Sequence, residues 1–141
     1  MKHQLILRVV AKGLLPYIFL YAFYVQWHGD FGPGGGFQAG VIFAAGVVLY
    51  TLIFGLQAAE DAIHPSLARA GAALGLLLYI GVGIVALLLG GEFLNYDTLG
   101  QHGQHYGILL VETGVFITVA SVMIMIFYSF AELVRVEHDD E

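Results

Sequence analysis

Four long apolar stretches, separated by short polar or glycine-rich segments, dominate this chain of 141 residues. They cover residues 9–27, 37–56, 70–89 and 106–130. Each is close to the ~20 residues that a helix needs to cross the hydrocarbon core of a bilayer. Because none of them alternates apolar and polar residues over ~10 positions, as barrel strands do, the pattern predicts helices. We therefore predict an all-α integral membrane protein, with four transmembrane helices in a single domain over residues 1–141.

The composition supports a membrane protein and excludes several functions. The chain is 59% hydrophobic and 11% charged, whereas soluble domains carry about 25% charged residues. The formal net charge of −6 argues against nucleic-acid binding and against a polybasic lipid anchor. The absence of cysteine excludes disulfides, thiol catalysis and cysteine-ligated clusters.

The basic residues predict how the helices are oriented. All five fall in the N-terminal segment, the second connection or the C-terminal tail, and they are Lys2, Arg8, Lys12, Arg69 and Arg135. The positive-inside rule places these three segments in the cytoplasm. We therefore predict that both termini are cytoplasmic and that the first connection lies outside.

The first connection is unusually rich in glycine. Five glycines lie between Gly29 and Gly36, and Pro33 fixes one backbone angle among them. This composition permits close backbone approach and favours a shaped turn over a slack tether. The motif comprises Gly29, Pro33, Gly34, Gly35, Gly36, Phe37 and Gln38. Because no Lys-Ser or Lys-Thr follows the glycines, the turn does not predict nucleotide binding.

Two polar residues flank Gly29 in this turn. His28 and Asp30 are candidates for pairing with each other, or for gathering cations near the mouth of an ion path. The alternative is ordinary turn chemistry, in which Asp30 accepts a hydrogen bond from its own backbone.

Glu112 is the one acidic residue well inside an apolar stretch. A carboxyl group within the membrane is costly, and it is by default a candidate for a functional role. A carboxyl that is neutral near pH 7 exchanges protons, so Glu112 is a candidate for an ion or proton pathway. The alternatives are a protonated carboxyl that holds two helices together, and a shallow position with access to water.

Two histidines precede this helix and are candidates for a proton relay. His105 lies seven residues before Glu112, on the same helix face, with a rise of about 10.5 Å between them. Histidine titrates near neutral pH, so His105 fits the entrance of a proton path. The alternative is that His102 and His105 are exposed loop residues. A metal site is not predicted, since His-x-x-His among glycines lacks further ligands.

Small residues recur at helical spacing in three of the stretches. They are Gly36, Gly40 and Ala44 in the second, Gly71 and Gly75 in the third, and Gly114 and Thr118 in the fourth. Such stripes let membrane helices approach closely. They predict packing within this chain, with packing against other subunits as the alternative.

Two segments resemble a known family. Tyr24-Val25-Gln26-Trp27-His28-Gly29 followed by Pro33-Gly34-Gly35-Gly36-Phe37-Gln38 is similar to the signature of the MnhB family, a small component of the Mrp-type (Mnh, Pha) multisubunit cation/proton antiporters. The segment Val111-Glu112-Thr113-Gly114-Val115 resembles the last-helix motif of the same family. Asp30 and Gly32 depart from the expected pattern.

The resemblance implies a small four-helix subunit of a hetero-oligomeric complex in the bacterial plasma membrane. That complex exchanges cytoplasmic Na⁺ for external H⁺, and its MnhB component neighbours the C-terminal part of MnhA, one of the large antiporter-like components. MnhB is required for assembly and antiport, and it is neither an enzyme nor dependent on a cofactor. The alternatives are a pure assembly scaffold and a membrane subunit of a related hydrogenase-like redox complex.

Overall fold

The computed structural model describes residues 2–29, 34–96 and 103–139. This part of the chain forms helices and contains no strand. The helices are α1 (Lys2–His28), α2 (Gly36–Phe54), α3 (Leu56–Ala62), α4 (Pro65–Leu88) and α5 (Gly103–Asp139).

Four of the helices are long and apolar enough to cross a membrane, as the sequence predicts. The candidate spans are Leu5–His28, Gly36–Phe54, Pro65–Leu88 and Gln104–Arg135. At 1.5 Å per residue, α2 just reaches the ~30 Å of the hydrocarbon core, whereas α5 extends well beyond it. Each predicted apolar stretch falls largely within one of these helices.

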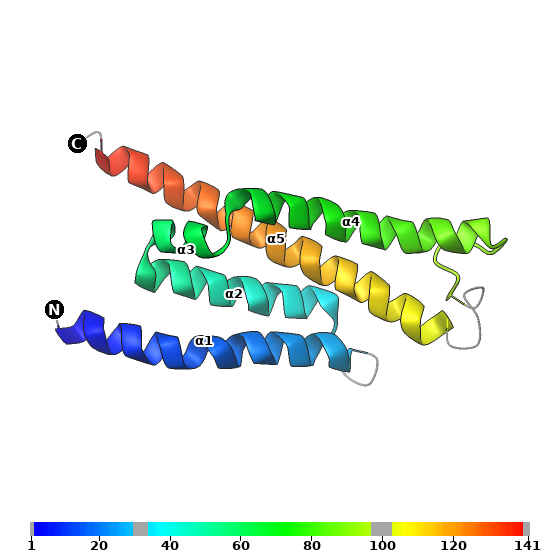
Figure 1. Ribbon diagram of the computed structural model, residues 1–141, viewed down its shortest axis with the longest axis horizontal. Helices are drawn as coiled ribbons and strands as arrows, with labels where there is room; N and C mark the ends of the chain where they lie inside the picture. The colour runs from blue at the N-terminus through cyan, green and yellow to red at the C-terminus, as the bar shows by residue number, and fades with distance from the viewer. Residues whose placement is uncertain (1, 30–33, 97–102, 140–141) are drawn as a thin grey trace.

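The long helices lie side by side in one layer, in the order α1, α2, α5, α4 (Figure 1). Within this layer α5 packs against both α2 and α4, while α1 packs mainly against α2. Both termini and α3 lie at one end of the layer, and the α1–α2 and α4–α5 connections lie at the other. α1 and α2 run antiparallel, as do α4 and α5, whereas the neighbours α2 and α5 run parallel, and the layer is not a closed bundle.

Small residues bring α5 into backbone contact with both of its neighbours. A Cβ atom placed on Gly40 of α2 would lie 2.9 Å from the Phe116 carbonyl oxygen of α5. One placed on Gly75 of α4 would lie 2.6 Å from the Gly114 carbonyl oxygen, and also against Thr118. Since even a methyl group does not fit at these positions, the glycine stripes serve packing within the chain. That prediction is confirmed.

The second connection contains a short helix that the sequence analysis did not predict. Gly55, with a φ angle of 96°, ends α2 and turns the chain directly into α3. The Tyr128 hydroxyl of α5 donates a 3.0 Å hydrogen bond to the Ala59 carbonyl oxygen of α3. α4 then begins at Pro65, where His64 Nδ1 accepts a hydrogen bond from the backbone N–H of Ser66. α4 thus begins five residues before the predicted start of the third stretch.

Candidate functional site

The Glu112 carboxyl group of α5 lies against the glycines on either side of the turn that joins α1 to α2. A Cβ atom placed on Gly29 would lie 2.7 Å from Oε2 and 3.0 Å from Oε1 of Glu112. A Cβ atom placed on Gly35 would lie 2.9 Å from the same Oε1. In the sequence the glycine turn and the lone carboxyl are separate features, 76 residues apart from Gly36 to Glu112. In the folded chain they form one site.

The two glycines are needed for different reasons. Gly35 has a φ angle of 139°, a conformation that residues with a side chain rarely adopt. Gly29 has no such backbone angle, and its requirement is space, because a side chain there would occupy the place of the Glu112 carboxylate. We refer to Gly29, Gly35 and Gly36 as the glycine cradle.

The start of α2 also meets the main chain of α5. A Cβ atom placed on Gly36 would clash with the Glu112 carbonyl oxygen, so the two helices touch at this level. Gly36 is the first residue of α2, and the free N–H groups at a helix N-terminus carry partial positive charge. A carboxylate beside Gly35 is therefore electrostatically complementary to the end of α2. The Gln38 side-chain oxygen lies 3.9 Å from the Cβ position of Gly35.

A buried glutamine lies one helical turn from the cradle. The Gln26 side chain is 3% exposed, and neither its Oε1 nor its Nε2 has a hydrogen-bond partner among the described residues. An unpaired buried amide costs roughly 1–3 kcal/mol by mutational measures. Gln26 was not among the candidate residues predicted from the sequence. The available signal was a polar residue between Val25 and Trp27, within an otherwise apolar stretch.

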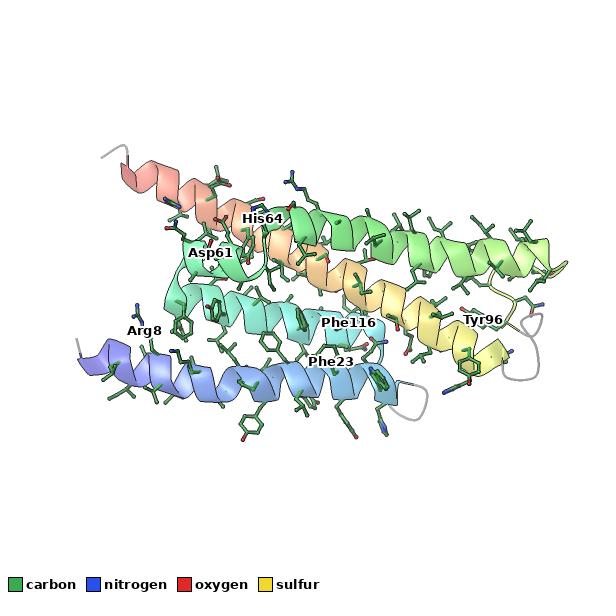
Figure 2. The ribbon with its side chains drawn as sticks, viewed as in Figure 1. Arg8, Phe23, Asp61, His64, Tyr96 and Phe116 are labelled. Carbon is green, nitrogen blue, oxygen red and sulfur yellow. The ribbon has the colours of Figure 1, made fainter. Side chains whose placement is uncertain are left out.

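Three phenylalanine rings pack together next to this site. Phe23 of α1, Phe43 of α2 and Phe116 of α5 have ring centroids 5.7–6.1 Å apart. Phe116 follows Glu112 by one turn, and Phe23 precedes Gln26 by one turn, so the rings lie on the side of the site that faces the middle of the layer. Figure 2 shows Phe23 and Phe116 side by side between α1 and α5, far from Arg8 and Asp61 at the opposite end.

The two predicted histidines that the structure describes are both exposed. The exposed His28 ring stacks on the Tyr24 ring, with centroids 5.2 Å apart, and it lies across α1 from the buried Gln26. His105 is exposed in the first turns of α5, in contact with Tyr106 and two turns from Glu112.

Other predicted residues contribute less to the described site. Phe37 is 60% exposed, and Gly34 packs against Val25. Asp30, Pro33 and His102 lie outside the described residues. Among the residues that are described, no group of three His, Cys, Asp or Glu side chains forms a metal centre.

Comparisons with known proteins point to one family. Residues 6–125 match the family described as "Domain related to MnhB subunit of Na+/H+ antiporter". Three proteins of Staphylococcus aureus, from strains Newman, JH1 and Mu3, are each named "Putative antiporter subunit mnhB2" and are 29% identical to this chain over 138 residues. The similarity covers 92% of this chain and 96% of each relative. The matched range includes the cradle, Gln26 and Glu112.

Proposed function

We propose that Glu112 lies on or beside the ion path of a Na⁺/H⁺ antiporter. The premise is that this chain belongs to the MnhB family and is a membrane subunit of such a multisubunit antiporter. The protein is a multi-pass component of the bacterial plasma membrane, and its partners are the other subunits of the complex. It is a part of a transporter rather than an enzyme. We also propose that it is required for assembly of the complex and that it contacts the C-terminal part of the MnhA component.

The observation that carries the proposal is the position of the Glu112 carboxylate in the glycine cradle. Its oxygens lie about 3 Å from two positions where any side chain larger than hydrogen would collide with them. The partial positive charge at a helix N-terminus stabilises a carboxylate beside it, and an ionisable group within the membrane is by default a candidate for an ion path. Such a group either exchanges protons or attracts monovalent cations towards the path.

The proposed orientation places this site at the outer side of the membrane. Both termini lie at the end of the layer opposite the cradle (Figure 1). The basic residues of the chain belong to segments at the end that holds the termini, which favours the cytoplasm for that end. External protons would then reach Glu112 without crossing the whole bilayer.

Cysteine labelling tests this orientation, because the natural chain has no cysteine. Gln57, at the end with the termini, and Glu92, beyond the far end of α4, are both exposed. A membrane-impermeant maleimide applied to intact cells is expected to label a Glu92→Cys protein and to leave a Gln57→Cys protein unlabelled. Labelling of the second protein alone would reverse the orientation.

The role of Glu112 is tested by Glu112→Gln in the whole complex. The measurement is Na⁺-dependent dissipation of ΔpH in vesicles, after co-purification has confirmed that the complex assembles. Glu132→Gln is the matched control, since Glu132 is an exposed carboxylate of the same helix. We expect Glu112→Gln to abolish most of the antiport and Glu132→Gln to retain it. Unchanged rate and apparent Na⁺ affinity in Glu112→Gln would remove this residue from the ion path.

A purely structural role is the second candidate, and the same packing favours it. Glu112 joins α5 to the α1–α2 turn, so its function would then be to fix that turn for docking by neighbouring subunits. On this reading Glu112→Gln either transports normally or fails to assemble. An assembled but inactive complex is inconsistent with it.

A further inference from the structure

We propose that Gln26 and Glu112 bind a water molecule between them, and that the carboxyl group exchanges its proton through this water. The inference rests on the proposed role of Glu112 as a proton-exchanging group. It adds a residue and a ligand to that site.

Gln26 is unusual among the buried polar side chains of the described residues. Thr51 is buried to a similar extent, but its hydroxyl donates a 2.8 Å hydrogen bond to the Val47 carbonyl oxygen within the same helix. The Gln26 amide has a longer reach and no such partner for either of its polar atoms. Buried amides are almost always paired with protein or ordered water, so this side chain points to a ligand that makes hydrogen bonds.

The helix geometry places Gln26 one turn from the glycine that contacts the carboxylate. Gln26 and Gly29 are three residues apart, so they share one face of α1 and differ in height by about 4.5 Å. The position of a Gly29 side chain lies 2.7 Å from Oε2 of Glu112. The Gln26 side chain therefore leaves α1 on a buried face of the helix, about one turn from the glycine beside the carboxylate.

The surroundings restrict where a ligand can reach this amide. The rings of Phe23, Phe43 and Phe116 pack together on the side towards the middle of the layer. The cradle and the turn lie on the other side. A small polar ligand between Gln26 and Glu112 is thus separated from the middle of the membrane by aromatic rings.

The chemistry of the amide favours water over a bare cation. A monovalent cation would satisfy Oε1 and leave the Nε2 hydrogens unpaired, because a cation accepts no hydrogen bond. Water both donates and accepts, so it pairs with Nε2, which a cation cannot do, and still donates to a carboxylate oxygen. Proton exchange then balances simply, since the water passes one proton to the Glu112 carboxylate and receives another from solvent. No atom other than hydrogen changes place.

The first test compares Gln26→Leu, which has similar size and no polar atom, with Gln57→Leu at an exposed glutamine. We expect the assembled Gln26→Leu complex to dissipate ΔpH at least about tenfold more slowly, as for loss of a proton-transfer partner, with its apparent Na⁺ affinity unchanged. The Gln57→Leu complex should match the wild type. An unchanged rate in Gln26→Leu overturns the relay. A raised Na⁺ requirement at an unchanged maximal rate overturns it in favour of a cation site.

The second test is direct and does not depend on transport. It is a structure of the wild-type complex at a resolution that shows ordered water. We expect density about 2.7–3.2 Å from the Gln26 amide and from Glu112. A Gln26 amide bonded directly to Glu112 or to a neighbouring polypeptide overturns the inference. Because this structure is of the wild-type complex, it decides the matter even if the Gln26→Leu complex fails to assemble.

Together with Glu112→Gln, this structure separates the two proposals. Water at the site with normal antiport in Glu112→Gln would refute the proposed function and the proton exchange, while the binding site itself stands. No water at the site with antiport lost in Glu112→Gln would refute only the inference about Gln26.

Discussion

Replacing Gly29 by alanine tests whether the Glu112 carboxylate occupies the glycine cradle. The new Cβ atom would lie 2.7 Å from Oε2, roughly 0.7 Å closer than the 3.4 Å at which ordinary packing begins. The same Cβ position lies 3.1 Å from the Gly35 Cα atom. The main chain at Gly29 therefore has little room to move away from the carboxylate. Overpacking of this kind costs about 1–3 kcal/mol.

The matched control is Gly13→Ala in the same helix. A Cβ atom at Gly13 meets nothing within 4 Å, and alanine in a helix interior is more stable than glycine by about 0.5–1 kcal/mol. We therefore expect Gly29→Ala to lower the Tm of the purified complex by several degrees and Gly13→Ala to leave it unchanged or slightly raised. Thermal loss of assembly, followed by size-exclusion chromatography, measures both.

A double variant shows whether the cost arises from the carboxylate. Glu112→Asp shortens the side chain by one bond of about 1.5 Å, which is enough to clear the new methyl group. Gly29→Ala combined with Glu112→Asp should then be more stable than the sum of the two single changes predicts. Equal stability of Gly29→Ala and Gly13→Ala, or strict additivity in the double variant, would refute the placement of Glu112 beside Gly29.

Three further predictions concern the helix contacts and the outer connection. Gly75→Ala should destabilise the complex by about 1–3 kcal/mol through overpacking against α5, whereas Gly81→Ala, whose Cβ meets nothing within 4 Å, should not; their Tm values are compared. Tyr128→Phe removes the 3.0 Å hydrogen bond to the Ala59 carbonyl oxygen, which keeps its bond from the Ile63 N–H, and should cost about 0.5–1.5 kcal/mol in the same assay. Burial raises the pKa of Tyr96, so the contribution of the neutral Tyr96 side chain to stability is complete below about pH 10 and is lost as pH rises through the raised pKa. In thermal unfolding at increasing pH, Tyr96→Phe should therefore lose less stability above pH ~10 than the wild type.

The long helices and the family could be predicted from the sequence, because both depend on local patterns. Apolar runs of ~20 residues report bilayer crossing directly, and the string Pro33–Gln38 carries the family signature. The glycine stripes likewise predicted close helix packing. They did not predict which helix each stripe meets, because spacing within one helix carries no information about its neighbour. The structure supplies that information by placing α5 between α2 and α4.

The composition of the site could not be predicted in the same way. The contact between Glu112 and Gly29 joins distant segments, and it depends on the order of the helices within the layer. The hydropathy of α1 did not identify Gln26, because a single amide hardly changes the mean hydropathy of a 24-residue span. Helix α3 was missed because its seven residues are too few for a clear periodic pattern. The bend before it depends on the positive φ angle of Gly55, which the sequence alone does not reveal.

The single row of helices has a consequence for transport. The described helices lie in one layer and enclose no lumen, so they do not by themselves surround a passage for ions. Any route past Glu112 runs along a broad side of the row, and its opposite wall has to be contributed by another polypeptide. Transport and assembly are then inseparable for geometric reasons. A substitution that merely widens the seam between neighbouring polypeptides would open the route to lipid and abolish exchange, even with every side chain of the cradle in place.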